Sequence, residues 1–536
     1  MTGADVRVRF EPEATEVLVP SGTTLLDAAH AAGVTIDAPC GGVGKCGACR
    51  VAVSGDLSPL TADEVNVLGG AGVSAGKRLA CRARATGDVI VTRPRKRKVS
   101  ARIVARADVD EPDVEPPVAR GLDREGAILG AAVDIGTTTV AVWLVDLRNG
   151  DILARAADLN AQRVHGDDVL SRVSALLAGE GAALQSAIAG QVGSLVTDAL
   201  GQVGAHAADL AEIVCCGNTA MTGILLGRDV AALAAAPYEG APTDEAVVPA
   251  PSLGMLSLGD ASVYVLPGIS AFVGSDITSG MLATRLAERE GRVLFADLGT
   301  NGEIVLRTDA GLIAASAAAG PALEGASIEC GMRAETGAIE RVERTGERLA
   351  LTVIGDVPPA GICGSGLLDL VACLLDAGVL DSDGLLRADV ADPLARDVIE
   401  RGDQRVFVVG AAHGIVLTQR DVRQVQLALA AVRVGIDLLL AEAAVRPDEV
   451  DGVVIGGGFG LHLEPATLVR VGLVPGSWAG ALSFAGNTAL AGARAALVSS
   501  SARERAREIA RAVRTVDLAA HPEFQQRFIS ALAFPS

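Results

Sequence analysis

A strand–turn–strand unit that occurs twice constrains the fold of this chain more than any other feature. The first copy is AAVDIGTTTVAVWLVDLRNGDIL at 131–153, and the second is VLFADLGTNGEIVLRTDAGLI at 293–313. Each copy has an apolar strand, an Asp-x-Gly-Thr turn, a second strand, a Gly-containing turn and a third strand. A second pair of similar stretches, GNTAMTGILLG at 217 and GNTALAGARAAL at 486, follows in the same order. Strands alternate with Ala- and Leu-rich helices from residue 129 onward, so the sequence predicts two similar α/β lobes that face one another.

The two Asp-x-Gly-Thr turns have the chemistry of a phosphate site. Backbone N–H groups and hydroxyls in such a turn can hold a phosphate, and the carboxylate can hold a hydrated Mg²⁺ or orient a water for attack on the γ-phosphate of ATP. One such turn alone is often only a turn, so the prediction depends on having two. The candidate residues are Asp134, Gly136, Thr137, Thr138 and Thr139 in the first turn, and Asp297, Gly299, Thr300, Asn301 and Gly302 in the second.

A run of glycines supplies a third element. In GVVIGGGFGLHL at 452–463 an apolar strand leads into Gly456, Gly457 and Gly458. Without side chains, these residues allow the backbone to approach a base and a ribose closely. The run is not G-x-G-x-x-G, and no acidic residue follows at the spacing of a dinucleotide fold, so dinucleotide binding is disfavoured.

Four cysteines near the N-terminus predict a metal cluster. Cys40, Cys46 and Cys49 have the spacing C-x5-C-x2-C, and Cys81 follows in RLACRA. Three close thiolates and a distant fourth favour a 2Fe–2S cluster, with structural zinc or free thiols as the weaker alternatives, because zinc ribbons use two C-x2-C pairs. Four glycines at 41, 42, 44 and 47 allow backbone N–H groups to turn toward the sulfurs.

The remaining patterns predict the domain limits. Residues 1–95 contain the strands VRVRF, TEVLVP, CRVAVSGDL and DVIVTR, and a helix in GTTLLDAAHAAGV that Thr23 or Thr24 caps and Gly33 ends. Residues 96–128 are rich in Pro, Asp and Glu and predict a linker or a small docking segment. The two lobes are expected at 129–290 and 291–536.

Charge and hydropathy exclude several functions. The net charge of −19 disfavours nucleic-acid binding, and RPRKRK at 93–98 is interpreted as a solvated linker. We find neither a secretory signal nor a run of about 18 apolar residues without charge, so we expect no membrane partner. Cys215, Cys216, Cys330, Cys363 and Cys373 do not form a disulfide framework and are interpreted as buried thiols, so we expect a cytoplasmic protein.

The motifs resemble two known groups of proteins. The cysteine spacing, with VPSGTTLLDAAHAAGVTIDAPC before it, is similar to the 2Fe–2S ferredoxins, in the adrenodoxin-like variant. The two turns and the triple glycine resemble the phosphate and adenosine motifs of the actin, sugar-kinase and heat-shock-chaperone ATPases. This resemblance implies a β-grasp ferredoxin-like (α+β) domain, a linker and a two-lobed α/β actin-like ATPase fold. It also implies that Asp134 and Asp297 hold Mg²⁺ or position water, and that GSDITSGMLA at 274 and AGNTALAGARAAL at 485 are the helices that connect the lobes.

The combination of both halves resembles the reductive activators of corrinoid proteins. Further stretches carry the resemblance: LNAQRVHGDDVLSR at 159–172, CGNTAMTGILLG, AAGPALEGASIECGMRA at 318–334 and GICGSGLLDL at 361–370. It implies ATP-dependent transfer of an electron from the cluster to an inactive Co(II) corrinoid protein of a methyltransferase system, and an upstream electron donor. Members often form homodimers, although no feature here predicts one. The chain is rather short for the family, which leaves room for trimmed loops.

Three alternatives remain open at the level of sequence. The chain could activate another low-potential metalloenzyme, it could be an electron carrier fused to a sugar or acyl kinase, or it could be a nucleotide-gated binding protein with a structural cluster. Whether ATP acts on electron transfer, docking or release is also open. His165 is interpreted as a structural loop residue, and Asp167 and Asp168 as helix caps rather than nucleotide ligands.

Overall fold

The computed structural model describes three stretches of the chain: 5–92, 107–115 and 128–535. The exceptions within them are residues 13, 35, 37, 39–41, 43, 45, 46, 48, 75, 167, 237, 239, 326, 403 and 458–462. The chain divides into two compact units, one of 1–98 with 159–188 and the other of 99–158 with 189–536.

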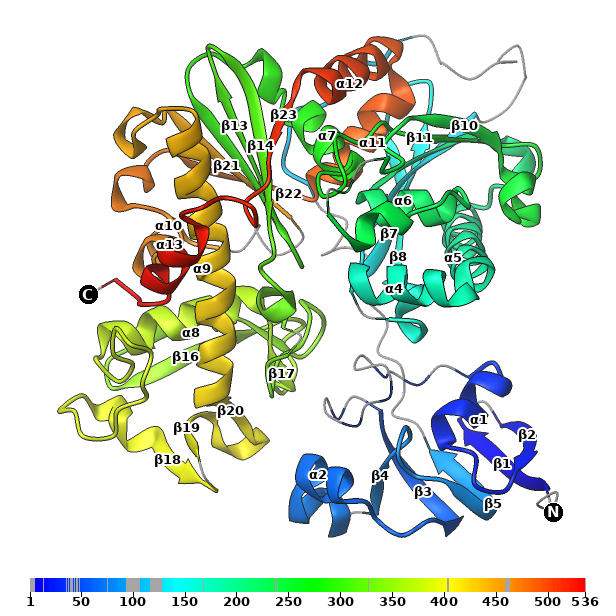
Figure 1. Ribbon diagram of the computed structural model, residues 1–536, viewed down its shortest axis with the longest axis vertical. Coiled ribbons are helices and arrows are strands. Elements are labelled where there is room, and N and C mark those ends of the chain that lie inside the picture. The colour runs from blue at the N-terminus through cyan, green and yellow to red at the C-terminus, as the bar shows by residue number, and fades with distance from the viewer. Residues whose placement is uncertain are drawn as a thin grey trace. The chain divides into compact units, whose positions relative to one another are not determined.

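The N-terminal part of the first unit is a five-stranded sheet with the order β2-β1-β5-β3-β4 (Figure 1). β1 pairs antiparallel with β2, as the predicted hairpin requires, and parallel with β5, which is the β-grasp arrangement. The predicted α+β fold is therefore confirmed. The strands are β1 (Asp5–Glu11), β2 (Thr15–Pro20), β3 (Arg50–Leu57), β4 (Lys77–Leu79) and β5 (Ala85–Thr92).

Two helices complete this sheet. In α1 (Leu25–Ala31), Thr24 is the cap and accepts a hydrogen bond from the Asp27 N–H, and the chain leaves the helix through Gly33 at φ +66°. α2 (Ala62–Ser74) was not predicted, because its glycines weaken the helical pattern. The rest of the first unit includes α4 (Val169–Ala175), which Asp168 caps as predicted, and the start of α5 (Gly181–Gln202). Asp167 lies outside the described residues.

The second unit contains two six-stranded sheets. The first has the order β10-β11-β9-β6-β7-β8, and the second has the order β22-β21-β12-β13-β14-β23. The predicted strand–turn–strand repeat is β6-β7-β8 in one sheet and β12-β13-β14 in the other. The first sheet has β6 (Leu129–Ile135), β7 (Thr139–Asp146), β8 (Ile152–Leu159), β9 (Leu210–Gly217), β10 (Ala246–Pro249) and β11 (Ser262–Val265); the second has β12 (Val293–Leu298), β13 (Gly302–Thr308), β14 (Gly311–Ala317), β21 (Gly452–Gly456), β22 (Leu482–Gly486) and β23 (Arg514–Val516).

Three helices pack away from the sheet that is nearest to them in sequence, so the spatial division does not follow chain order. α7 (Ser275–Ala283) precedes the second sheet in sequence, yet Ile277 and Met281 share a core with residues of β12 and β13. α11 (Thr488–Val498) and α12 (Ser500–Ala512) come last, yet their side chains complete the core of the first sheet. α7 and α11 pack against each other (Figure 1).

The second sequence repeat does not mark equivalent positions. GNTA at 217 follows β9, which lies beside the central strand β6, whereas GNTA at 486 follows β22, which lies at the edge beyond β21. Both stretches share helix-cap chemistry instead: Asn218 caps α6 (Thr219–Leu225) and Asn487 caps α11. The strand–turn–strand repeat therefore supports the two-lobed architecture more strongly than the GNTA repeat does.

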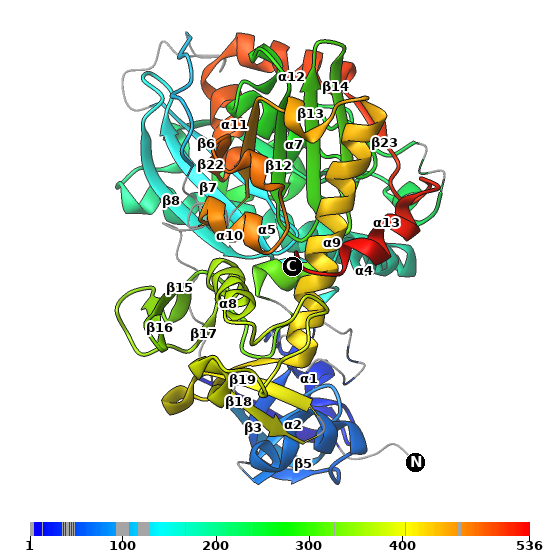
Figure 2. The same ribbon diagram turned by 90° about the vertical axis from the view of Figure 1, so that its left-hand side faces the viewer.

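The second sheet carries additional elements. They are β15 (Ala338–Thr345), β16 (Arg348–Val353), β17 (Gly361–Ile362), α8 (Gly364–Asp376), β18 (Val398–Arg401), β19 (Gln404–Gly410), β20 (Ile415–Thr418), α9 (Gln419–Glu442), α10 (Pro465–Arg470) and α13 (Phe524–Ala531). By length and composition, α9 is one described helix that could cross a membrane, but 72% of its apolar window is buried inside the protein. Its apolar face packs on β13 and β14, as Figure 2 shows.

Part of the predicted linker is docked. Ala107 forms a β-bridge with Gly486, and the N–H groups of Asp108 and Glu115 donate to the carbonyls of Ala485 and Val498 at 2.9 and 3.1 Å. Residues 107–115 therefore match the docking-segment alternative; 93–106 and 116–127 lie outside the described residues.

Candidate functional site

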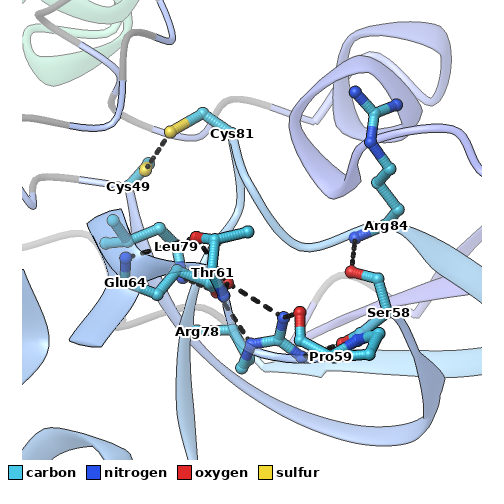
Figure 3. Close-up of polar contacts among 9 residues, drawn as sticks. All are labelled: Cys49, Ser58, Pro59, Thr61, Glu64, Arg78, Leu79, Cys81 and Arg84. Atoms are coloured by element: carbon cyan, nitrogen blue, oxygen red, sulfur yellow. Dashed lines mark hydrogen bonds and ion pairs between the residues drawn. The ribbon is translucent and has the colours of Figure 1, made fainter.

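Two of the four predicted cluster ligands lie close together. The sulfurs of Cys49 and Cys81 are 3.3 Å apart, both thiols are buried and neither forms a disulfide (Figure 3). A disulfide bond is about 2.05 Å long, and two thiolates on one tetrahedral metal at about 2.3 Å from each sulfur would be about 3.8 Å apart. The observed separation is nearer to the second value. Cys40 and Cys46 lie outside the described residues.

Cys49 is prepared to act as a ligand. The side-chain hydrogen bond with Cys81 lowers the pKa of Cys49 to about 6, although burial alone would raise it. The thiolate is the form that binds metal, so Cys49 is ready to ligate near neutral pH. The donor set of this pair therefore fits an iron–sulfur centre.

Glycines shape the loop before Cys49. Gly44 and Gly47 have φ values of +81° and +70°, in the left-handed region. A Cβ on Gly44 would lie 2.3 Å from Nε of Arg82, and one on Gly47 would lie 2.7 Å from the side chain of Val67. Any other residue at these positions would strain the backbone and push these neighbours away.

A buried ion pair supports the strand that leads to Cys81. Arg78 Nε and Nη2 donate to the two carboxylate oxygens of Glu64 at 2.7 and 3.0 Å, and Leu79 N–H donates to the same carboxylate at 3.2 Å (Figure 3). Burial by itself raises the pKa of Glu64, but hydrogen bonds from Arg78 and Thr61 lower it below its usual value. The pair ties α2 to β4 immediately before Cys81.

The two Asp-x-Gly-Thr turns meet at one cavity of about 200 Å³ in the second unit. The structure therefore brings together most of the predicted nucleotide residues. Those that line the cavity are Asp134, Gly136, Thr137, Thr138, Thr139, Asp297, Gly299, Thr300, Asn301 and Gly457.

Hydrogen bonds link the turns to each other. The hydroxyls of Thr138 and Thr300 both donate to Oε2 of Glu324, at 3.0 and 2.9 Å, and lie 3.3 Å apart. Residues 162 positions apart in sequence thus share one carboxylate. Hydroxyls that converge in this way can hold phosphate oxygens from both sides.

Four carboxyl groups at this cavity are buried together: Asp134, Asp276, Asp297 and Glu303. Burial raises the pKa of Asp134 to about 6, and burial with repulsion among the carboxylates raises those of Asp297 and Asp276 to about 7 and about 8. The pKa of Glu303 is raised for the same reasons. No basic side chain forms an ion pair with these four groups within the described part of the chain.

This arrangement fits a hydrated divalent cation. A cation would offset the repulsion that raises the four pKa values. Among the described residues, no three His, Cys, Asp or Glu side chains are placed to ligate a metal directly. Mg²⁺ usually retains several waters when it binds to proteins.

Several residues of the cavity were not predicted. Asn487 Nδ2 donates to Asp134 at 2.9 Å, Thr488 Oγ1 donates to Asp297 at 3.3 Å, and Asn218 Nδ2 donates to Thr137 at 2.8 Å. All three belong to the repeated GNT stretches, so that repeat was the signal for them. Asp276 and Glu303 had no such signal, because an Asp in a helix and a Glu in a strand are usually exposed.

Two predicted glycines, Gly302 and Gly456, do not line the described cavity. A Cβ on Gly302 would lie 2.7 Å from Val432 of α9, and one on Gly456 would lie 3.0 Å from Thr488. These two glycines permit close packing beneath the site. Gly458 lies outside the described residues.

The other predicted minor residues are mostly structural. Cys215, Cys216 and Cys363 are buried, as expected, whereas Cys330 and Cys373 are only partly buried. Cys363 also lines the nucleotide cavity. His165 Nδ1 lies 2.6 Å from Oε2 of Glu180, which agrees with a structural role.

Family comparisons assign the three regions. Residues 8–86 match the 2Fe–2S iron–sulfur cluster binding domain, residues 129–289 match the RACo middle region, and residues 291–536 match the C-terminal domain of RACo, the ASKHA domain.

Individual proteins agree with these assignments. The chain is 32% identical over 426 residues to the corrinoid activation enzyme RamQ of Eubacterium limosum, covering 77% of this chain and 71% of the relative. It is 25% identical over 416 residues to a [Co(II) methylated amine-specific corrinoid protein] reductase of Methanosarcina barkeri, covering 72% of each. A solved structure of a reductive activator for a corrinoid iron–sulfur protein matches 99% of this chain and 98% of its own, with 30% identity and a TM-score of 0.72.

Proposed function

Because the chain belongs to the family of reductive activators of corrinoid proteins, we propose that it uses ATP to reduce the inactive Co(II) corrinoid of a partner protein to Co(I). One electron converts Co(II) to Co(I), the donor centre on this chain is oxidised by one electron, and a separate upstream donor reduces it again. The single observation that carries the proposal is that one chain holds a buried, hydrogen-bonded cysteine pair and a cavity lined by both Asp-x-Gly-Thr turns.

The N-terminal cysteines would supply the electron site. Cys40, Cys46, Cys49 and Cys81 would hold a 2Fe–2S cluster, which supplies one-electron chemistry when bound. The chain's own contribution is to keep Cys49 deprotonated, to fix Cys81 through the Glu64–Arg78 pair, and to fold a glycine loop around the sulfurs.

The cavity of the second unit would bind ATP. Thr138 and Thr300 would hold phosphate oxygens from opposite sides, and Gly457 would lie against the nucleoside. Asp134 and Asp297 would hold hydrated Mg²⁺ and orient water for attack on the γ-phosphate. Asn487 and Thr488, which contact these two carboxylates, would keep them in position.

The energetics of the electron transfer explain why the reaction would use ATP. Plant-type clusters have potentials near about −400 mV, and Co(I) is a stronger reductant than that. The reduction therefore needs free energy from differential binding, which a nucleotide-driven closure of the two lobes would provide. We place this reaction in the cytoplasm and propose the domain limits 1–95, 96–128, 129–290 and 291–536.

The ATPase rate tests this function. Adding a Co(II) corrinoid protein should raise the rate of ATP hydrolysis, whereas adding sugars or short-chain acids should neither raise it nor yield a phosphorylated product. Phosphorylation of a small molecule, with no response to any Co(II) corrinoid protein, would show that the chain is instead a kinase.

A further inference from the structure

A second cavity lies in the second unit, away from the nucleotide residues. Its volume is about 140 Å³, and four arginines line it: Arg155, Arg285, Arg494 and Arg505. The docked segment Ala107–Glu115, called the strap below, forms another part of its wall. None of these residues lines the nucleotide cavity. We call this space the arginine cavity.

The strap supplies carboxylates to two of the arginines. Glu111 pairs with Arg494 of α11, and Asp113 pairs with Arg285, which follows α7, at 2.8 Å. The Arg494 side chain is only 10% exposed, whereas that of Glu111 is 79% exposed. A buried guanidinium is costly without a counter-charge. Here the counter-charge comes from a surface side chain, which solvent or another anion can replace.

The other two arginines have no partner on the strap. Arg505 Nε is buried without a hydrogen-bond partner, although it forms an ion pair with Glu288 at 3.4 Å, and Nη1 of the same side chain donates to Ser501 Oγ at 3.1 Å. Arg155 lies over the ring of Trp143 at 5.8 Å and forms no ion pair within the described residues. Trp143 also lines the cavity.

One guanidinium of the wall has no ion pair among the described residues. Glu111, Asp113 and Glu288 pair with Arg494, Arg285 and Arg505, which leaves Arg155. Guanidinium groups match the geometry of phosphate oxygens and bind them through paired hydrogen bonds. A guanidinium without an ion pair, a buried Nε without a hydrogen bond and a small polar space therefore occur together.

We propose that the arginine cavity binds a phosphate-type oxyanion, which competes with Glu111 and Asp113 of the strap for Arg494 and Arg285. The ligand class is orthophosphate or the phosphate of a small phosphomonoester. Binding would weaken the attachment of the strap to α11 and to the end of α7.

Tryptophan fluorescence gives a direct test. The chain has two tryptophans, so Trp478→Phe leaves Trp143 as the sole reporter. Orthophosphate is titrated at constant ionic strength, with chloride exchanged for it. Its binding should change Trp143 emission until the change saturates. Arg505→Gln should abolish the change, and Arg511→Gln, an exposed arginine on the same helix, should not.

The strap provides a variant with the opposite effect. Glu111→Gln with Asp113→Asn removes the competing carboxylates, so orthophosphate should bind about 3- to 10-fold more tightly. If Trp478→Phe does not fold, calorimetry with orthophosphate on the otherwise unaltered protein replaces fluorescence. Absence of saturable binding in both the parent and the strap variant would overturn the proposal.

A nucleotide-site variant separates this proposal from the proposed function. Asp297→Asn should leave the orthophosphate response unchanged. A response that Asp297→Asn removes and Arg505→Gln preserves would assign the anion to the nucleotide cavity and contradict the proposal. Small phosphomonoesters are tested in parallel with orthophosphate. The comparison distinguishes free orthophosphate from the phosphate group of an ester as the ligand.

Discussion

The cysteine pair and the carboxylate cavity are both buried clusters of acidic groups, yet their pKa values shift in opposite directions. The pKa of Cys49 falls to about 6 because its sulfur shares a hydrogen bond with that of Cys81. The pKa of Asp276 rises to about 8 because it is buried and faces Asp297 and Asp134. Burial alone therefore does not determine the charge of a site. The hydrogen-bond donors and counter-charges next to the buried group determine it.

The difference has a functional meaning. The thiolate site is negative near neutral pH before any iron binds, so it suits a resident metal. In the carboxylate site, burial and mutual repulsion favour the protonated form of the carboxyl groups. Each of the following substitutions alters one side of this comparison.

The largest expected effect is on the thiol side. Cys81→Ser replaces a thiolate ligand by a hydroxyl, which binds iron poorly, so the visible absorption of the cluster and all Co(I) formation should disappear, while ATP hydrolysis without a partner persists. Absorption spectra and ATPase assays of purified protein measure both. Cys330→Ser, a partly buried thiol outside both sites, is the matched control. A normal cluster spectrum in Cys81→Ser would remove Cys81 from the ligand set.

The next effect is on the carboxylate side. Asp297→Asn removes the negative charge that would hold Mg²⁺ and orient water, so the ATPase rate should fall by about 100-fold or more, with the cluster spectrum unchanged. Asp309→Asn, in an exposed turn after β13, should retain the rate. If Asp297→Asn hydrolyses ATP at the normal rate, the phosphate site is misassigned.

The ion pair behind the thiols should show an intermediate effect. Glu64→Ala leaves Arg78 as a buried, unpaired charge and should destabilise the N-terminal sheet by about 3–5 kcal/mol. Chemical unfolding, followed by loss of cluster absorption, measures this. The double variant Glu64→Ala with Arg78→Met should recover much of the loss. Equal destabilisation of the single and double variants would mean that the pair contributes packing rather than charge compensation.

The smallest effect concerns pH. Asp276 titrates near 3.8 in the unfolded chain and near 8 in the folded protein, so between these values the folded state holds a proton that the unfolded chain has lost. The free energy of unfolding therefore decreases as pH rises through this window. The Asp276→Asn variant does not lose stability as pH rises through this window. Its Tm should therefore exceed that of the parent by about 2–4 °C at pH 8 and match it near pH 4.

Calorimetry of the nucleotide-free protein measures both Tm values. A Tm gain in Asp276→Asn that is the same at pH 4 and pH 8 would show that Asp276 is destabilising for a reason other than its charge.

Local patterns allowed the elements near each site to be predicted, but not how they assemble. The strand–turn–strand repeat and the Thr24 cap depend on neighbours in sequence, and each appears as expected. Asp276 and Glu303 could not be found in this way, because their importance comes from burial next to residues of other segments. The packing of α7 and α11 against the two sheets could not be predicted either. Hydrophobic periodicity shows which face of a helix is buried, but not which other element covers that face.

The repeated GNT stretches show a different limit. Their similarity was interpreted as evidence for two similar lobes, yet it reflects two Asn caps that deliver side chains to Thr137 and Asp134 from non-equivalent strands. Similar chemistry can recur because a site needs it, without symmetry of the fold.

The most direct test of coupled electron transfer is the absorption band of Co(I). The reduced protein is mixed with a Co(II) corrinoid protein, with ATP or with ADP, and the spectrum is followed over time. We predict that the Co(I) band grows with ATP and not with ADP, and that it is absent in Cys81→Ser and in Asp297→Asn. Absence of the band with ATP, for any corrinoid partner and despite an intact cluster, would contradict the proposed function.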